Sequence, residues 1–403
     1  ESESHQRWDS AGVEVVENYS AVWSGNDGWT VDPAPFLELG GEDSPPEAQF
    51  YQISGTLVLR DGRIVVGNRG TNQLLFFDSA GRFLEGKGRE GEGPGDFLGL
   101  YRLWSFGVDS LFVFDDYLSR VSVFDAQGRF ARSWRVQVPG GVPFWFVFPR
   151  TLAGDGSAYF GTRTEGWRPP VGAVKDSLQI LRFDRDGSFL ADLGPFFWRE
   201  IYSPGAQRHG TNTTSSWTSD LPFARRSHIG PLGRGFFFAD SESFEIKVFA
   251  PEGTLQRVVR AVRPNRPVTA RDRESLKSEW LGEEGSRGPN SSFSNWVREM
   301  VFPETMPAYG RVIGDSEGCL WVSEYRSPGD PLHQATVFDT EGRLLGIVDL
   351  PPGLVVREIG RDYLIGVWRD SFDVEHVRMH RLFRQPGFGE PDREAAPLLR
   401  PAS

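Results

Sequence analysis

The sequence predicts an all-β protein, a six-bladed β-propeller of four-stranded blades whose last blade is closed by an N-terminal strand. Three observations predict this fold. A pattern of short strands and tight turns recurs five times, a sixth unit is one strand short, and a strand of the missing kind precedes the first unit. Repeats of about 40 residues, each made of four short strands, are typical of β-propellers.

Each of the five complete units contains the same turn motif. An apolar run ends in Phe and usually Asp, two residues follow, and then come Gly, one further residue and an apolar residue. We interpret this motif as a strand, a tight turn with glycine at a position of positive φ, and another strand. A further turn and strand precede it in each unit. The motifs begin at Phe77, Phe124, Phe183, Phe249 and Phe338.

The sixth unit supplies three strands, at 355–359, 363–368 and 374–383, before the chain becomes rich in proline and glycine. The segment 35–40 precedes the first unit as 82–86 precedes the second, with a similar apolar pattern. We therefore expect 35–40 to form the fourth strand of the last blade. Such closure removes open sheet edges, which would otherwise invite aggregation.

The second unit shows most clearly how the strands end. An apolar strand ends in Asp115, a short polar loop follows, and the next strand ends in Phe124 and Asp125. This arrangement resembles NHL repeats. The resemblance covers roughly residues 30–384 and implies a six-bladed propeller of an exported bacterial type, but no particular activity. Three other units place Asn68, Asp240 and Glu324 where the second has Asp115, whereas the third and sixth have Gly161-Thr162 and Trp368-Arg369 there.

The composition excludes several classes of protein. Asp and Glu number 55 against 44 Lys and Arg, and the net charge of −11 argues against a nucleic-acid-binding face. The longest wholly apolar stretch, 142–149, is far shorter than the roughly 20 residues that cross a bilayer, so no transmembrane segment is expected. The single Cys319 lies in an apolar run, and we expect a buried structural thiol.

We expect the protein to be exported. The chain starts at Glu1 without Met, as it would after removal of a leader, and the propellers that it resembles are of an exported type. The expected location is the periplasm or the periplasmic side of a membrane. A lipid anchor upstream of Glu1, as in a lipoprotein, would fit.

The irregular parts of the chain are expected on one face. The spacing between successive Phe anchors nearly doubles along the chain, while the turn after each Phe keeps its length. The extra residues therefore lie in the connections between the second and third strands, or between blades, which open on the same face. We expect loops there at 163–176, 194–222, 264–307 and 328–333, with helices at 271–280, capped by Thr269 or Asp272, and at 293–300. The predicted organisation is an N-terminal extension at 1–29, a single propeller at 30–384 that includes the 264–307 insertion with its short helices, and a Pro-rich tail at 385–403.

The insertions are rich in aromatic residues, which admits two interpretations. The aromatic side chains fill small cores beneath the insertions, or they form a surface that binds a partner, since aromatic residues and Arg are enriched at interface cores. The partner-binding candidates are Trp167, Phe196, Phe197, Trp198, Tyr202, Trp217, Trp280 and Trp296.

Three carboxylates provide the residues of an alternative, metal-binding interpretation. Asp115, Asp240 and Glu324 end equivalent strands and would be candidate metal ligands near the central channel, although Ca²⁺ needs six to eight converging oxygens. The other interpretation of these carboxylates is that each accepts hydrogen bonds from its own loop. No catalytic motif is present in the sequence, and we expect neither catalytic residues nor a cofactor.

Two functions from different classes follow. In the favoured one, the chain is a non-enzymatic exported interaction or scaffold subunit whose insertion face binds a protein partner. That partner would be a membrane-embedded complex with an extrinsic periplasmic subunit, for example a photosynthetic reaction-centre and antenna complex, which no motif indicates. In the alternative, the chain is a propeller hydrolase or lyase with a metal site at the central channel.

Overall fold

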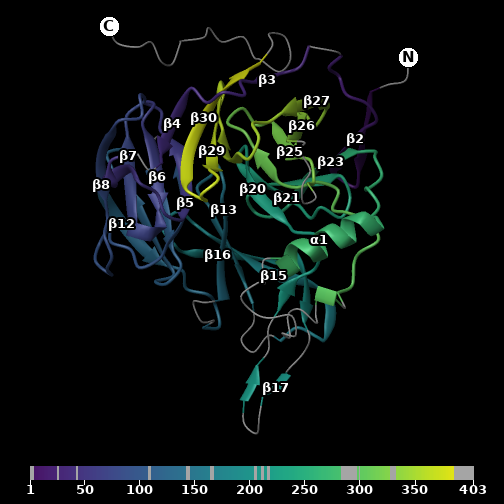
Figure 1. The fold of residues 1–403 in the computed structure, drawn as a ribbon, viewed down its shortest axis with the longest axis horizontal. Coiled ribbons are helices and arrows are strands. Elements are labelled where there is room, and N and C mark those ends of the chain that lie inside the picture. The colour runs from purple at the N-terminus through teal and green to yellow at the C-terminus, as the bar shows by residue number, and fades with distance from the viewer. Residues whose placement is uncertain are drawn as a thin grey trace.

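Six sheets of four or more strands follow one another along the described part of the chain and form the blades of an all-β propeller (Figure 1). The computed structural model describes residues 4–24, 27–41, 44–107, 110–141, 146–163, 168–203, 207–209, 213–215, 218–282, 297–298, 300–326 and 333–384. In each blade, successive strands pair antiparallel, and the first strand lies innermost.

The first three blades share this plan. Blade I consists of β5 (Ile53–Val58), β6 (Ile64–Asn68), β7 (Gln73–Phe77) and β8 (Phe83–Lys87). Blade II consists of β9 (Leu100–Phe106), β10 (Ser110–Asp115), β11 (Arg120–Phe124) and β12 (Phe130–Arg135). Blade III consists of β13 (Val147–Leu152), β14 (Ala158–Thr162), β15 (Gly172–Phe183), β16 (Phe189–Ser203) and β19 (Ser219–Asp220). Two short 3-10 helices lie in connections of blade I, η1 (Pro46–Ala48) and η2 (Arg69–Thr71).

The last three blades include strands from the N-terminal region. Blade IV consists of β20 (His228–Leu232), β21 (Gly235–Ala239), β22 (Glu245–Phe249) and β23 (Leu255–Ala261), with β2 (Val13–Asn18) and β1 (His5–Ser10) beyond β23. Blade V consists of β24 (Val312–Gly314), β25 (Leu320–Ser323), β26 (Gln334–Phe338) and β27 (Leu344–Asp349). Blade VI consists of β28 (Val355–Ile359), β29 (Tyr363–Arg369) and β30 (Glu375–Phe383), with β3 (Thr30–Val31) and β4 (Leu37–Gly40) on β30. Outside the blades lie a hairpin of β17 (Gln207–His209) and β18 (Thr213–Ser215), and the helix α1 (Ala270–Gly282).

The predicted closure of the ring is confirmed. β4 pairs antiparallel with β30, with Leu39 opposite Val377, so an N-terminal strand completes the last blade. The innermost strands β5, β9, β13, β20, β24 and β28 each contact the next, and β28 contacts β5. A continuous ring of first strands therefore surrounds the centre of the molecule.

The repeated turn motif forms the tight turns that the sequence predicts. In blade I, Gly81 has a φ of 82°, a conformation that other residues rarely adopt. The Oδ1 atom of Asp78 accepts hydrogen bonds from the backbone N–H groups of Ala80 and Arg82, at 3.0 and 2.8 Å. The motif therefore fixes the turn through a side-chain acceptor at its start and a glycine in its middle.

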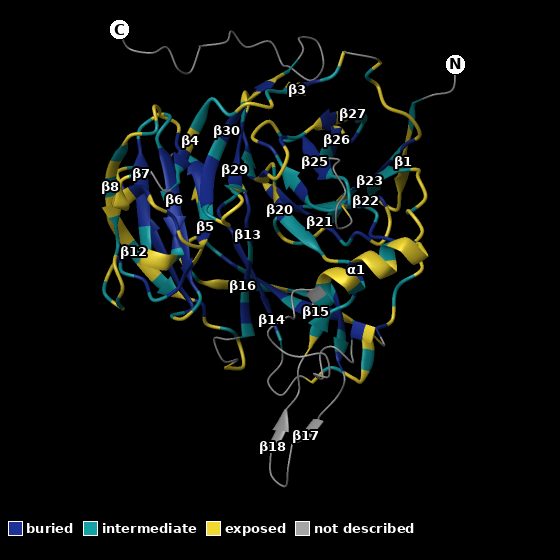
Figure 2. Ribbon diagram, viewed as in Figure 1, coloured by how far each residue is buried: buried dark blue, intermediate teal, exposed yellow. Residues whose placement is uncertain are grey.

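The core lies between blades. In the described residues, apolar clusters are shared by neighbouring blades, so that Ile365 and Val367 of β29 pack with Val66 and Leu75 of blade I. Equivalent clusters join each of the other neighbouring pairs of blades around the ring. Figure 2 shows the buried residues concentrated in the strands of the blades, whereas α1 is largely exposed. Each blade is thus held by packing against the blades on both sides.

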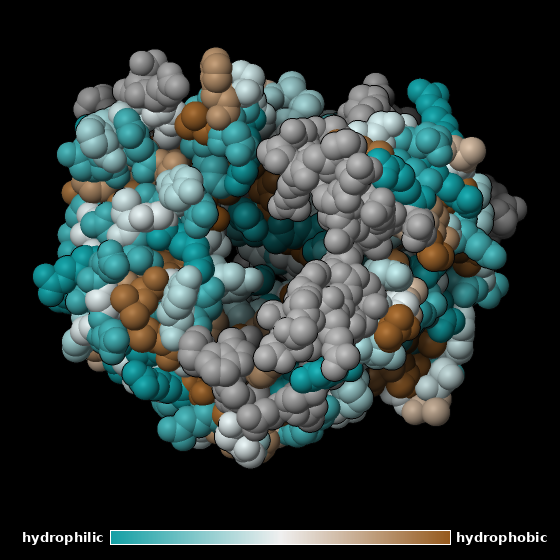
Figure 3. Space-filling view, turned by 60° about the horizontal axis from the view of Figure 1, so that its bottom comes forward, coloured by the Kyte–Doolittle hydropathy of each residue, from teal (hydrophilic) through white to brown (hydrophobic). Residues whose placement is uncertain are grey.

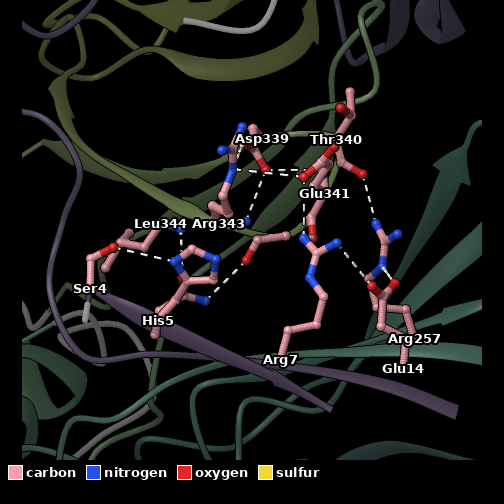
Figure 4. A network of polar contacts seen from close by, with 12 residues as sticks. Ser4, His5, Arg7, Glu14, Arg257, Asp339, Thr340, Glu341, Arg343 and Leu344 are labelled. Carbon is pink, nitrogen blue, oxygen red and sulfur yellow. Dashed lines mark hydrogen bonds and ion pairs between the residues drawn. The ribbon is translucent and has the colours of Figure 1, made fainter. Parts of the chain in front are cut away.

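The N-terminal strap, residues 4–24 and 27–40, runs along the outer edges of blades IV, V and VI. β1 and β2 form a hairpin, and β2 pairs in parallel with β23. Arg7 contacts Glu341 at 3.3 Å, and Arg257 contacts Glu14 at 2.5 Å, so ion pairs tie the hairpin to blades IV and V (Figure 4). Most of the segment that the sequence analysis assigned to an N-terminal extension is therefore built onto the propeller.

Two expected loops contain strand instead. β15 starts at Gly172 and β16 continues to Ser203, because their antiparallel pairing extends beyond the blade, with Lys175 opposite Glu200. The segments 163–176 and 194–222 are thus partly an extension of blade III. The expected helix at 271–280 is present as α1, and the Thr269 hydroxyl accepts a hydrogen bond from the N–H of Asp272 at 3.2 Å. Thr269 is therefore the residue that caps this helix.

Candidate functional site

The insertion face is the candidate functional surface. We define it as the side where the connections between second and third strands, and between successive blades, leave the propeller. β17, β18 and α1 lie in connections that leave on this side, as expected from the sequence, with the hairpin of β17 and β18 at the bottom of Figure 1 and α1 at its right. Figure 3 turns this side toward the viewer and shows the molecule hollowed at its centre, with hydrophilic residues in the hollow. The central channel therefore opens within this face.

The structure places Phe196 in a core between blades III and IV. Its ring centroid lies 5.1 Å from that of Phe238, 5.7 Å from that of Phe249 and 6.5 Å from that of Phe236. The next residue, Phe197, is half-buried and lies opposite Ser177 on β15. Phe196 thus supports the base of the long hairpin.

Trp198 contacts two guanidinium groups. The Arg199 and Arg163 guanidinium carbons are 4.2 and 4.6 Å from its ring centroid, and the Phe148 ring is 4.9 Å away. Arg163 also pairs with the buried Asp176, whose pKa is raised by desolvation although Arg163 opposes the effect. Cation–π contacts of this kind orient an indole ring and hold it half-buried.

Tyr202 and Trp280 belong to a small core under the insertions. Both pack against Val297 and Met300, and Trp280 also packs against a second cluster that contains Leu276 of α1. The described aromatic candidates other than Phe197 thus pack in small cores, which agrees with the first of the two interpretations, and binding by any of them stays a prediction. The other three candidates, Trp167, Trp217 and Trp296, lie outside the described residues.

A cavity of about 620 Å³ lies beside α1. Trp280 and Leu276 of α1 line one side, and His228, Arg226 and Tyr325 are also among the lining residues. Burial raises the pKa of the Tyr325 hydroxyl to about 12, so it stays protonated at any physiological pH. The cavity could therefore accept a group with both apolar and polar parts.

Sequence reasoning missed a cluster of exposed tyrosines on the same face. Tyr51, Tyr101 and Tyr117 are 66%, 47% and 60% exposed. The guanidinium carbon of Arg69 lies 5.5 Å from the ring centroid of Tyr101 and 5.8 Å from that of Tyr117, and Arg69 pairs with Asp116 at 3.0 Å. We call Tyr51, Arg69, Tyr101 and Tyr117 the tyrosine patch.

The signal for the tyrosine patch was available in the sequence. The patch lies in the short connections of blades I and II and on β9, whereas the sequence analysis considered the aromatic residues of long insertions. Residues such as Tyr117, in the turn of blade II that corresponds to the turn of blade I containing Arg69, share the insertion face by topology alone. Phe372, in the corresponding turn of blade VI, is 79% exposed and belongs to the same face.

Each candidate metal ligand binds groups in its own surroundings. Asp115 is fully buried and accepts hydrogen bonds from the N–H groups of Leu98 and Leu118, at 2.7 and 2.9 Å, and from a third N–H. Asp240 accepts one from the N–H of Glu242 at 3.0 Å. Both carboxylate oxygens of Glu324 bind the Arg263 guanidinium, at 3.0 and 3.1 Å.

These carboxylates do not converge. Over the part of the chain that the structure describes, no three His, Cys, Asp or Glu side chains lie in an arrangement that could hold a metal ion. Asp115 instead joins the loop before β9 to the turn after β10. In blade I, Asn68 likewise binds the loop before the first strand, where its side chain bonds the backbone of Tyr51 and Gln49 at 2.9 and 3.1 Å.

Comparison with known proteins supports the fold. No family description and no curated protein sequence matches the chain. A putative exported protein from Bacteroides fragilis is similar in structure, with 11% identity, a TM-score of 0.50 and coverage of 92% of this chain and 99% of that one. A protein from Bacteroides vulgatus matches at 9% identity and a TM-score of 0.49, covering 89% of this chain and all of the other (100%). Virginiamycin B lyase from Staphylococcus aureus matches at 10% identity and a TM-score of 0.39, covering 88% and 99%.

These identities are too low to transfer function. The likeness to the Bacteroides fragilis protein is one of fold alone. None of the helices in the described residues is long and apolar enough to cross a membrane.

Proposed function

We propose that the chain is an exported, non-enzymatic NHL-like propeller of six blades that binds a protein partner through its insertion face. The observation that carries this proposal is the tyrosine patch. Tyrosine and arginine are the residue types that most often dominate binding energy in interfaces, because a rigid ring and a multidentate cation lose little entropy on binding. Loops on a rigid scaffold are also the usual place for binding residues.

The geometry of the tyrosine patch supports a preformed surface. Arg69 is held by Asp116 and by contacts with two rings, so the patch needs little ordering when a partner docks. β9 and the turn after β10, which carry Tyr101 and Tyr117, belong to a blade that packs on both sides. These preorganised aromatic side chains are exposed to solvent in the free protein. Covering them with a partner protein removes apolar surface from water, which favours binding.

The partner that we propose is a membrane-embedded complex with an exposed periplasmic side, for example a photosynthetic reaction-centre and antenna complex. The chain would bind there as a peripheral subunit on the periplasmic side, with or without a lipid anchor. The description of a structurally similar Bacteroides fragilis protein as a putative exported protein is consistent with this location. Trp198, Tyr202 and Trp280 would then hold the insertions in the shape that the partner meets.

The test is native fractionation of gently solubilised membranes from the source organism. We expect the chain to migrate with a large complex at fixed stoichiometry. The double variant Tyr51→Ala with Tyr117→Ala should migrate alone while keeping its circular dichroism spectrum. The matched control replaces two exposed apolar residues near the opposite face, Leu84→Ala with Leu190→Ala, and should still co-migrate.

Either of two results would refute the proposal. If the unmodified chain migrates on its own, it has no stable partner in the membrane. If the tyrosine variant co-migrates unchanged, the insertion face is not the contact.

A further inference from the structure

Four arginines project from the ring of innermost strands. Arg102 lies on β9, Arg150 on β13 and Arg357 on β28, while Arg311 immediately precedes β24. Because these first strands contact one another around the ring, their side chains on the inner side face a shared central space. The hydrophilic hollow in Figure 3 opens into this space.

Local backbone geometry supports this orientation for two of the four. The register of β13 with β14 shifts at Arg150, and the register of β28 with β29 shifts at Arg357. Each arginine is the extra residue of a β-bulge, a feature that redirects a side chain out of the regular alternation. Blade II has its own shift at Tyr101, next to Arg102.

None of the four guanidinium groups has a carboxylate within ion-pairing distance in the described residues. Their side chains make a single hydrogen bond there, from Nη2 of Arg150 to Oγ of Ser227 at 3.1 Å. The Nε atoms of Arg150 and Arg357 are buried and have no acceptor. Unpaired buried donors of this kind are costly unless a ligand or water supplies the acceptor.

The nearest acidic groups are occupied elsewhere. Glu375 acts on Arg357 only at longer range, because its carboxylate binds Arg369 at 2.7 Å and the N–H of Ile53 at 2.8 Å. The carboxyl of Glu358 is bonded to Val58 and Tyr363. By contrast, the half-buried Arg225 and Arg384 pair with Glu200 and Asp315, at 3.1 and 2.7 Å.

The four guanidinium charges repel one another across the central space. Burial, together with the charges of neighbouring arginines, lowers the pKa of Arg150 and that of Arg311 to about 10. The neighbour is Arg102 for Arg150, and Arg357 and then Arg102 for Arg311. Burial, followed by the charges of Arg311 and Arg150, lowers the pKa of His228 on β20 to about 4. At neutral pH, His228 is therefore an uncharged neighbour, and the positive potential comes from the guanidinium groups.

We propose that the arginine-lined channel binds a small multivalent oxyanion. Guanidinium groups offer paired N–H donors that match the oxygens of phosphate and carboxylate groups. A monovalent anion would neutralise one of four charges, whereas a multivalent anion can bind several guanidinium groups at once. The ligand would enter through the mouth on the insertion face. This site is independent of the tyrosine patch and of any partner protein.

The test compares anions at constant ionic strength. Thermal unfolding and titration calorimetry of the full chain would be measured with inorganic phosphate, with citrate and with acetate, sodium chloride being used to equalise ionic strength. We expect phosphate, citrate or both to raise the unfolding midpoint saturably, and acetate to have no such effect. Phosphate alone would assign a tetrahedral phosphate group, and citrate alone a polycarboxylate.

Variants give the decisive comparison. In Arg357→Gln, and separately in Arg102→Gln, we expect the binding of the active anion to weaken about tenfold or more, since a hydrogen bond to a charged group contributes roughly 1.5 kcal/mol or more. Without anion, both variants should unfold at a higher temperature than the native protein, because removing one charge relieves repulsion. Arg132→Gln, on the outer strand β12 and paired with Asp186 at 2.9 Å, is the matched control and should bind as the native protein does.

The opposite signs of the two effects separate binding from folding. A variant that is more stable than the native protein without anion, and whose unfolding midpoint the anion does not raise, has lost a ligand contact and not its fold. The proposal is overturned if neither phosphate nor citrate gives a saturable shift, or if both channel variants bind the anion as tightly as the Arg132→Gln control.

Discussion

Glu358 is a buried carboxyl whose protonation should set part of the pH dependence of stability. It lies on β28, and its carboxyl accepts a hydrogen bond from the backbone N–H of Val58 at 3.4 Å and bonds the hydroxyl of Tyr363. Burial raises the pKa of Glu358 from 4.5 to about 7, and the two hydrogen bonds only partly oppose this. The change to test is Glu358→Gln, which keeps the shape and an acceptor oxygen but cannot ionise.

The sign follows from proton binding. Between pH 4.5 and about 7, native Glu358 keeps a proton that the unfolded chain has lost. The free energy of unfolding therefore falls as pH rises through this window, and the difference between the two pKa values corresponds to about 3 kcal/mol. His228 acts in the opposite sense, because its pKa of about 4 lies below the ordinary histidine value of 6.5. The comparison must therefore be the variant minus the native protein, in which the contribution of His228 cancels.

The assay is urea unfolding followed by tryptophan fluorescence at pH 4.5, 6 and 8. Relative to the native protein, Glu358→Gln should gain about 3 kcal/mol between the lowest and the highest pH. Replacement of an exposed glutamate, Glu47→Gln, should leave the difference flat. A stability difference between Glu358→Gln and the native protein that does not change with pH would refute the reasoning, since it would mean that Glu358 ionises normally in the fold.

Three further predictions rest on buried polar groups. Asp115→Ala should lower the free energy of unfolding by about 3 kcal/mol in the same urea assay, because three backbone N–H groups lose their acceptor. A loss below about 1 kcal/mol would contradict this. Asn18→Ala should cost about 2 kcal/mol and speed proteolysis of the N-terminal strap, because its amide bonds Arg260, Gly342 and Leu344 at 2.8 to 3.0 Å; an unchanged cleavage rate would count against it. Cys319 should react with a thiol reagent only after unfolding, because burial raises its pKa to about 12; rapid labelling of the native protein would show otherwise.

Local signals were enough to predict the propeller. The residues of the turn motif determine the turn by themselves. In blade II, Gly128 has a φ of 69° and Asp125 accepts hydrogen bonds from the N–H groups of Gln127 and Arg129, as in blade I. The closure by β4 was predictable because that strand repeats the pattern of β8, its equivalent in the first blade. Wherever turn, strand and apolar pattern agreed within a unit, the prediction matched the structure.

Contacts between distant segments were not predictable in this way. The parallel pairing of β2 with β23 places Val16 opposite Val259, and no local pattern in either strand predicts this pairing. The extension of β15 and β16 depends on cross-strand pairing beyond the blade, which a polar sequence such as that around Lys175 does not reveal. Tertiary contacts decide such segments more than their intrinsic preference does.

The channel arginines show the same limit more sharply. Arg102, Arg150, Arg311 and Arg357 are spread over the chain without a shared motif, and only the ring of first strands brings them together. From the sequence alone, each of them would be predicted to be a surface residue of an amphipathic strand. A systematic comparison of charged residues on first strands, blade by blade, is the signal that could have found them.

The electrostatics of the channel also bear on the metal site that the sequence suggested. Four guanidinium groups with no counter-ion among the described residues repel a divalent cation and attract an anion, and the low dielectric of a protein-lined channel strengthens both effects. The chain carries a net charge of −11, so acidic groups that could have paired with these arginines are abundant. They are instead engaged elsewhere, as Glu375 is with Arg369 and Glu358 is with Tyr363. An acidic protein that leaves its channel cationic bears a cost in stability there, and a bound oxyanion is the ligand that would offset it.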